Sequence, residues 1–190
     1  FFGDSGDRNR DETQAPTEAM IQAEIVPALT QVVENKNIHA DIRGGALIAL
    51  ARTGKSMAHV KTFFEVAKAD SGEDKVVQES AILALGILQL QKPEIRDFLI
   101  NLVDNMDVPF RARCFAAISL GLLQDNSDEV FACLERRLDG RESTPDVPVC
   151  ALLTIGMIGD NKKVEQLSKW LAEGRIGKNK LNDLEKAYLI

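Results

Sequence analysis

The feature that most constrains this 190-residue chain is a segment that recurs four times at one fixed period. The copies align without gaps, each beginning 35 residues after the one before; they are DIRGGALIALART from residue 41, VVQESAILALGIL from 76, RARCFAAISLGLL from 111 and DVPVCALLTIGMI from 146. Columns of small or branched apolar residues recur in every copy, namely Ala46, Ala81, Ala116 and Ala151; Leu50, Leu85, Leu120 and Ile155; and Ala51, Gly86, Gly121 and Gly156. Because self-similarity at a fixed period is typical of solenoids and arrays, the sequence predicts a repeat protein.

Each repeat has a second half whose apolar residues follow a helical spacing. In the segment from residue 94, Ile95, Phe98, Leu99 and Leu102 fall at positions i, i+3, i+4 and i+7, which is one face of an α-helix. The first halves are instead apolar on almost every side and rich in Ala and Gly, which is typical of helices packed on two sides. We therefore expect each unit to consist of a helix, a short turn, a second helix and a longer polar loop.

These patterns predict an all-α fold in which the helix pairs stack into a right-handed α-solenoid. The expected division is a flexible N-terminal tail or linker at 1–16, then one domain at 17–190 made of a half repeat at 17–40, repeats at 41–75, 76–110, 111–145 and 146–180, and a truncated repeat at 181–190. Pro27 is expected near the start of the helix in the half repeat, where a missing amide costs little. We interpret the chain as a piece of a longer array, cut within a repeat.

The apolar cores ALIALA, AILALG, AAISLG and ALLTIG resemble those of HEAT repeats, specifically the short HEAT-like repeats of the phycobilisome-lyase type. Asp107 with Arg113 matches that family's loop Asp and first-helix Arg, and Arg43 also fits. Gln78 and Pro148 depart from the pattern, so the polar ladder is incomplete here. The resemblance covers the whole expected repeat domain and implies a scaffold or binding surface. It also raises an enzymatic alternative, a subunit of a lyase-type enzyme that acts on a bilin-like ligand.

The hexapeptide ARTGKS at residues 51–56 ends like a phosphate-binding loop, but its surroundings do not favour a nucleotide site. Such a loop follows a β-strand and carries Gly five residues before its second Gly, whereas here that position is Ala49 and a helix is expected before it. We instead expect Gly54 to supply a left-handed residue at a helix end and Ser56 to cap the next helix.

Charge and cysteine content narrow the classes of function. The net charge is −6 and the isoelectric point is about 5.0, which disfavours a nucleic-acid partner because such binders present a basic face. No apolar run is long enough for a membrane-spanning helix. Cys114, Cys133 and Cys150 lie in apolar helical segments without a CxxC pair, so we expect buried, unpaired thiols, which leans toward a cytoplasmic location.

No catalytic, cofactor-binding or metal-binding group of residues is expected. His39 and His59 are the only histidines, and neither belongs to a His-Glu dipeptide of the kind that holds the di-iron centre of some HEAT-repeat hydroxylases. We expect His39 in a loop and His59 in the first turn of a helix. A metal site would have to draw on scattered Asp and Glu residues.

In a HEAT-type stack the second helices line the concave side, and side chains off their apolar stripes form a continuous surface. Phasing each helix on its stripe predicts exposed residues at Thr30 and Gln31 and a partner-binding surface of Lys61, Glu65, Asp97, Ile100, Asn101, Phe131, Glu135, Arg136, Lys169 and Trp170. Large apolar groups among exposed charges are typical of protein interfaces. For Phe131 and Trp170 the alternative is packing against the adjacent repeat.

The segment ERRLDGRE at 135–142 is the densest charge cluster. It is interpreted either as a solvated helix end and loop or as an anchor for an acidic partner through Arg136 and Arg137. Leu134 and Leu138 are expected to point inward, which leaves Glu135 and Arg136 facing outward.

The sequence therefore favours a non-catalytic protein–protein interaction or scaffold module that binds a protein partner on its concave face, with no cofactor. Two alternatives stay open, the lyase-type subunit acting on a bilin-like ligand and a purely structural spacer in a larger assembly.

Overall fold

The computed structural model describes residues 16–54, 57–68, 70–139, 144–159, 161–176, 179–181 and 183–187. Within these ranges the regular structure is helical apart from one two-stranded hairpin, which confirms the all-α class predicted from the sequence. The elements in chain order are α1 (Glu18–Met20), the π-helical turn η2 (Ile21–Ile25), α2 (Val26–Glu34), α3 (Ala40–Arg52), α4 (Met57–Ala67), α5 (Lys75–Ile87), α6 (Pro93–Asp104), α7 (Phe110–Leu123), α8 (Asp128–Asp139), α9 (Asp146–Ile158), α10 (Asn161–Glu173), β1 (Arg175–Ile176), β2 (Asn179–Lys180) and α11 (Asp183–Ala187).

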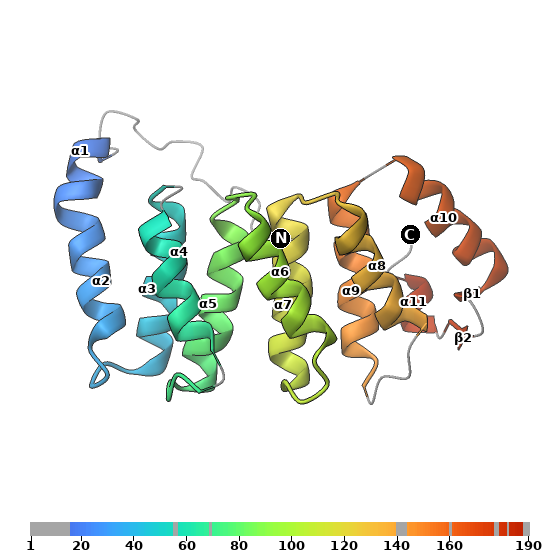
Figure 1. Ribbon diagram of the computed structural model, residues 1–190, viewed down its shortest axis with the longest axis horizontal. Helices are drawn as coiled ribbons and strands as arrows, with labels where there is room; N and C mark the ends of the chain where they lie inside the picture. The colour runs from blue at the N-terminus through green and yellow to red at the C-terminus, as the bar shows by residue number, and fades with distance from the viewer. Residues whose placement is uncertain are drawn as a thin grey trace.

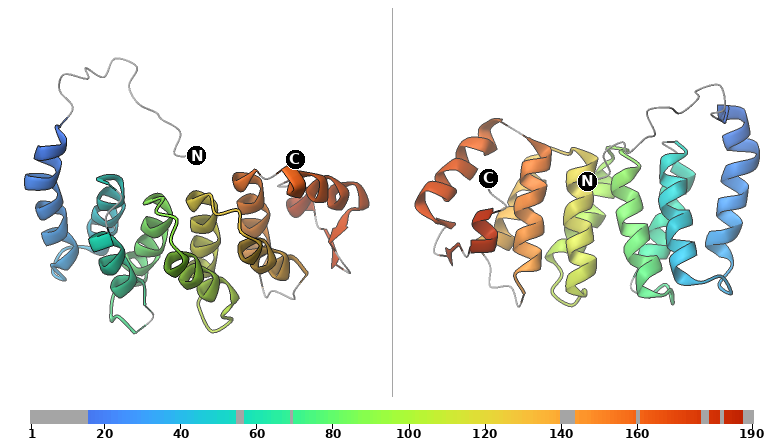
Figure 2. Two further views of the ribbon diagram at one scale, coloured as in Figure 1. Left: turned by 45° about the horizontal axis from the view of Figure 1, so that its top comes forward. Right: turned by 180° about the vertical axis from the view of Figure 1, so that it is seen from behind.

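Most of the helices form two layers along the long axis of the molecule (Figure 1). One layer holds α3, α5, α7 and α9, and each of these helices packs against the next. In front of them lie α4, α6 and α8, each packed against the first-layer helix that follows it in the chain. Two further views show the same order, with α2 at one end and α10 at the other (Figure 2). A central helix such as α5 thus has neighbours on several sides, which explains why its sequence is apolar almost all round.

The core follows the apolar columns recognised in the sequence. Every Ala of the first column and every Leu or Ile of the second is buried, with at most 5% of its surface exposed. On α6, Ile95 and Leu99 are fully buried while Phe98 and Leu102 are half-buried, so the apolar stripe of this helix faces the core as predicted. Leu134 and Leu138 of α8 also point inward, with 0% and 6% exposed.

Small residues let the first-layer helices approach closely. A Cβ atom added at Gly86 of α5 would lie 2.6 Å from the Cα atom and 2.8 Å from the carbonyl oxygen of Ser119 on α7. At Gly121 of α7 the nearest atoms belong to Met157 and Thr154 of α9, at 3.2 and 3.3 Å. At Gly156, in the same sequence column, no atom of another described segment lies within 4 Å of such a Cβ atom. The glycine column therefore serves close packing at two positions and is spatially open at the third.

This difference gives a matched pair of substitutions. Gly86→Ala is expected to lower the free energy of unfolding by roughly 1–3 kcal/mol, because the backbone of α7 would have to move. Gly156→Ala is expected to be neutral or to add up to about 1 kcal/mol, because alanine favours the helix and has room. Urea unfolding of both variants measures the difference, and equal stability of the two would contradict this packing.

Side chains at corresponding positions donate similar hydrogen bonds. Arg43 Nε donates to the carbonyl oxygen of Val33 at 2.9 Å, and Arg113 Nε donates to that of Val103 at 3.0 Å. Gln78, 35 residues from each of these arginines, donates through Nε2 to the carbonyl oxygen of Lys68 at 3.2 Å. In each case the acceptor lies ten residues before the donor. A shorter amide side chain therefore makes the contact that arginine makes in the neighbouring units.

One of the first two residues after each first-layer helix has a positive φ. Gly54, Gln89, Gln124 and Gly159 all have positive φ, at 144°, 49°, 55° and 65°. The positive φ at Gly54 agrees with the helix-end role predicted for it, and glycine reaches this region without a Cβ penalty. Lys55 and Ser56, including the predicted cap at Ser56, lie outside the described residues.

The helical segment that contains Pro27 starts well before the proline. Pro27 is the second residue of α2, but α2 continues directly from α1 and the π-helical turn η2. The helical segment thus begins at Glu18, and the prediction that Pro27 lies near its start is wrong. The amide of Val26 donates to the carbonyl oxygen of Ile21, five residues back, which widens the helix just before the proline ring. A proline inside a helix is tolerated where the local turn departs from α geometry.

The C-terminal hairpin was not predicted. β1 and β2 pair antiparallel, with Arg175 opposite Lys180 and Ile176 opposite Asn179. Ile176 and Leu181 are buried, each with 4% exposed, and Asn179 Nδ2 donates to the carbonyl oxygen of Leu138 at 3.2 Å. Strands of two residues leave no alternation for a sequence pattern to reveal. Beyond the hairpin, α11 packs against α9, in the segment where a further first helix is expected.

Among the helices of the described ranges, none combines the length and apolar character that crossing a membrane requires.

Candidate functional site

The candidate site is the second-helix face, by which we mean the predicted outward residues of α2, α4, α6, α8 and α10. Most of its predicted members are accessible in the structure. The exposed ones are Gln31, Lys61, Glu65, Asp97, Asn101, Arg136 and Lys169, and the half-buried ones are Thr30, Ile100, Glu135 and Trp170. The phasing of these helices from their apolar stripes is thus correct for every residue of this face except Phe131.

Phe131 was expected on the surface and is buried, with only 2% exposed. The apolar side of α8 is wider than its leucines suggest, since Val130 and Cys133 are also fully buried. Lys163 of α10 covers the ring, with Nζ 4.5 Å from the ring centroid in cation–π geometry. Phe131 therefore packs against the adjacent helix pair, which was the alternative raised for it, and is removed from the accessible surface.

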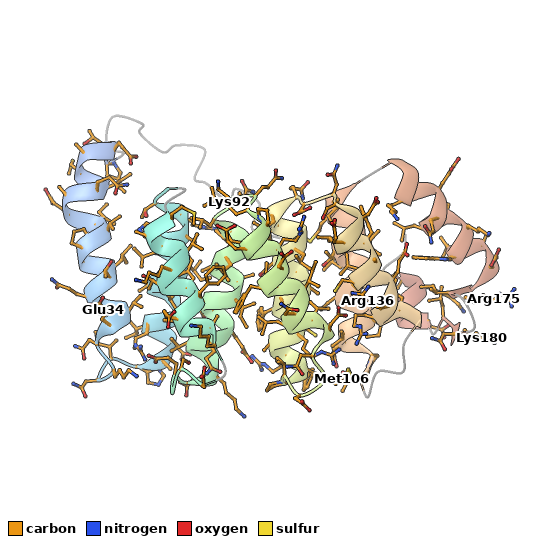
Figure 3. The ribbon with its side chains drawn as sticks, viewed as in Figure 1. Glu34, Lys92, Met106, Arg136, Arg175 and Lys180 are labelled. Atoms are coloured by element: carbon orange, nitrogen blue, oxygen red, sulfur yellow. The ribbon has the colours of Figure 1, made fainter. Side chains whose placement is uncertain are left out.

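Ionic contacts join neighbouring second helices. Arg136 of α8 and Asp104 of α6 approach to 2.6 Å, and Arg137 lies 3.5 Å from the same carboxylate. Glu135 of α8 lies 3.5 Å from Lys163 of α10. Figure 3 shows Arg136 on the front layer, with Met106 in the turn below. The arginines of the charge cluster therefore tie α8 to α6, which neither interpretation of that cluster anticipated.

A groove lies at the N-terminal end of the second-helix face. It has a volume of about 350 Å³, and its lining includes Lys61 and Glu65 of α4 together with residues of α2. Arg43 and Glu73 also line it and form an ion pair at 2.6 Å, with 6% and 9% of their side chains exposed. The hydrogen bond from Arg43 lowers the pKa of Glu73 below its ordinary value. Lys61 and Glu65 thus line the same groove as the nearly buried Arg43–Glu73 ion pair.

A second hollow lies at the other end, on α10. It has a volume of about 500 Å³ and is lined by Glu165, Gln166, Lys169 and Trp170. The indole of Trp170 is half-buried beside charged and amide side chains. An amphipathic ring in such a setting can contact a partner through both its apolar surface and its N–H group. Of the predicted large apolar residues, Trp170 and Ile100 thus remain accessible.

The histidines fit the roles expected of them. His39 caps α3, and its Nδ1 accepts a hydrogen bond from the amide of Asp41 at 3.3 Å. His59 lies in the first turn of α4 with 8% exposed, and its Nδ1 has no hydrogen-bond partner among the described residues. Burial lowers the pKa of His59 below its ordinary value, so the ring favours the neutral form. In the described ranges, no group of three or more His, Cys, Asp or Glu residues is arranged to hold a metal ion.

The cysteines differ from the expectation of three buried thiols. Cys133 is fully buried, whereas Cys114 and Cys150 are only half-buried. These two lie 36 residues apart on α7 and α9, so they do not share a sequence column, and the structure was needed to show that they face each other. The apolar columns gave no sign of this pairing, nor of the contacts made by Asp104 and Lys163.

Comparison with models of known protein families gives no match, and no curated protein is significantly similar to the chain.

Proposed function

We propose that this chain is a HEAT-like α-solenoid with a 35-residue period that acts as a non-catalytic interaction or scaffold module. A protein partner binds the second-helix face, which we expect to be the concave side. The observation that carries this proposal is the accessibility of eleven of the twelve predicted outward residues, since only Phe131 among them is buried. Such a surface exists before the partner arrives.

Recurring geometry supports the repeat architecture. Positive φ after each first-layer helix and side-chain bonds to a carbonyl ten residues back both recur at positions 35 residues apart. A third recurring contact joins neighbouring first-layer helices, since Ser119 donates to Ile82 O and Thr154 donates to Ala117 O, both at 2.9 Å. Contacts limited to adjacent units are what stacked repeats are expected to have.

Rigidity of the face supports binding over a spacer role. Phe64 of α4 and Phe98 of α6 are in tilted ring contact, with 4.9 Å between ring centroids and 59° between ring planes. The Arg136–Asp104 and Glu135–Lys163 pairs continue the links to α8 and α10. Exposed ion pairs contribute little to stability individually, but together with the rings they hold the helices in register. When the binding surface is already formed, no conformational entropy is lost in ordering it on binding, and the complex is more stable by that amount.

The chemistry of the face favours a protein partner. It mixes both signs of charge with amide groups, and it offers Ile100 and Trp170 as apolar contacts. A nucleic acid would call for a basic stripe, whereas Lys61 stands beside Glu65 and Lys169 beside Glu173. A helix or an extended segment with mixed charge and an apolar anchor fits such a surface.

The test compares two variants with the same change of charge. Lys61→Glu with Lys169→Glu alters both ends of the second-helix face, and Lys75→Glu with Lys180→Glu alters exposed lysines away from it. Lys180 lies on the C-terminal hairpin (Figure 3). Each form is used as bait in a native extract, and any retained protein is purified and titrated against the three baits by calorimetry.

We expect a partner that binds the wild-type chain and the Lys75/Lys180 variant equally. The Lys61/Lys169 variant is expected to bind at least about tenfold more weakly, which corresponds to roughly 1.4 kcal/mol. Equal affinity for all three baits would place binding elsewhere on the molecule. Recovery of no specific protein by any bait would favour the spacer alternative.

A further inference from the structure

A pocket with two thiols opens between α7 and α9, in the layer opposite the second-helix face. It has a volume of about 400 Å³, and Phe110, Phe115 and Ile118 supply most of its apolar lining. Cys114 of α7 and Cys150 of α9 both line it, and each is half-buried. The two helices lie side by side in the rear view (Figure 2) and pack directly against each other. The thiols are therefore adjacent and accessible to a small molecule.

The repeat geometry explains why these two side chains meet. Gly44 and Ser80 occupy the corresponding positions on α3 and α5, also 36 residues apart. A Cβ atom on Gly44 would lie 2.6 Å from Ser80 Oγ, so a side chain at the first position points at the side chain at the second. With cysteine at both positions, the same arrangement puts one sulfur against the other.

The thiols share a hydrogen bond that makes them unequal. Cys114 donates its S–H to the sulfur of Cys150, which lowers the pKa of Cys150 below its ordinary value and raises that of Cys114. Cys133 provides a contrast within the same chain, because burial raises its pKa to about 12. A thiolate is the nucleophile in disulfide exchange, so Cys150 is the reactive member of the pair.

We propose that Cys114 and Cys150 form a redox-active dithiol that closes into a disulfide between α7 and α9 by exchange with a small-molecule disulfide. The ionised sulfur of Cys150 attacks one sulfur of the reagent R–S–S–R, breaks its S–S bond and releases R–S⁻. The sulfur of Cys114 then loses its proton to solvent and attacks Cys150 in the mixed disulfide, which releases the second R–S⁻. Both thiolates take up protons, so two protein thiols are oxidised and one R–S–S–R is reduced to two R–SH.

Closing the bond has a structural consequence. The disulfide would join neighbouring first-layer helices covalently and close a loop that contains the whole of α8. A cross-link between α7 and α9 restrains how far they can separate, and hence the local curvature of the stack. The dithiol is independent of the proposed partner binding, since it lies in the other layer.

The experiment uses the full chain, first reduced and then held in graded ratios of oxidised to reduced glutathione. Acid quenching and alkylation are followed by intact mass and a peptide map. The wild type is expected to lose two hydrogen atoms in one step and to yield a peptide linking Cys114 with Cys150. Cys133→Ser is expected to close at the same glutathione ratio, because Cys133 takes no part.

Single-thiol variants resolve the order of the steps. Cys114→Ser is expected to stop at a glutathione adduct on Cys150, and Cys150→Ser to form its adduct on Cys114 at least tenfold more slowly. A pair that stays reduced where a flexible dithiol peptide is oxidised would overturn the proposal. The proposal would also be overturned by a disulfide that involves Cys133 or that joins two chains. A glutathione adduct on the wild type that never proceeds to the Cys114–Cys150 disulfide would overturn it as well. If a serine variant fails to fold by circular dichroism, the wild-type and Cys133→Ser maps still decide the outcome.

Discussion

Leu85→Asp is expected to abolish cooperative unfolding of the central helices. Leu85 is fully buried on α5, which packs against α3, α4 and α7. An aspartate there would place a carboxylate among apolar atoms without a partner, a loss of several kcal/mol in a domain whose whole stability is roughly 5–15 kcal/mol. Circular dichroism during heating should show a lower helical signal and a broad transition or none.

Ala116→Asp is expected to behave in the same way, because Ala116 is fully buried on α7. The matched control is Ala132→Asp on α8, where the alanine is exposed and the change should stay within about 0.5 kcal/mol. Normal thermal unfolding of Leu85→Asp or Ala116→Asp would contradict the burial of these columns. Unfolding of Ala132→Asp would instead contradict the phasing of α8.

Arg43→Ala is the second change with a large expected effect. Arg43 pairs with Glu73 at 2.6 Å while its Nε donates to the carbonyl oxygen of Val33, and both side chains are at most 9% exposed. Removing the guanidinium leaves the nearly buried carboxylate of Glu73 with Lys36, at 3.3 Å, as its remaining ion-pair partner among the described residues. Loss of one partner from a buried pair costs about 3–5 kcal/mol. Urea unfolding at pH 7 measures this loss, and Lys68→Ala, which removes an exposed pair with Glu65, should change little.

The same pair makes stability depend on pH in the acid range. The hydrogen bond from Arg43 lowers the pKa of Glu73 in the folded chain below the ordinary value of 4.5. Glu73 therefore contributes stability that is fully present well above pH 4.5 and is lost as the pH falls through its lowered folded pKa. In Glu73→Gln this part of the acid loss should be absent, and in Arg43→Ala it should be reduced. The free energy of unfolding of the wild type, Glu73→Gln and Arg43→Ala is measured from neutral to acidic pH. An equal loss of stability in all three proteins would contradict the role assigned to Glu73.

Much of the second-helix face could be read from single helices. An apolar stripe at helical spacing predicts which side of α4, α6 or α10 faces outward, and Lys61, Asp97 and Lys169 are exposed accordingly. The stripe does not say how wide the covered side is. That width depends on the neighbouring helix, which is why Phe131 beneath Lys163 was assigned to the wrong side.

By itself, the sequence determined the helices, their order and the buried columns, because each helix carries its own apolar periodicity and that signal is local. Only the tertiary structure decided how neighbouring helices meet. The structure shows that Arg136 pairs with Asp104, that Gly86 packs closely against the backbone of Ser119 and that Cys114 lies next to Cys150. These contacts depend on the lateral offset and the separation of adjacent helices. Both are set by packing between helices, so the apolar pattern of a single helix does not reveal them.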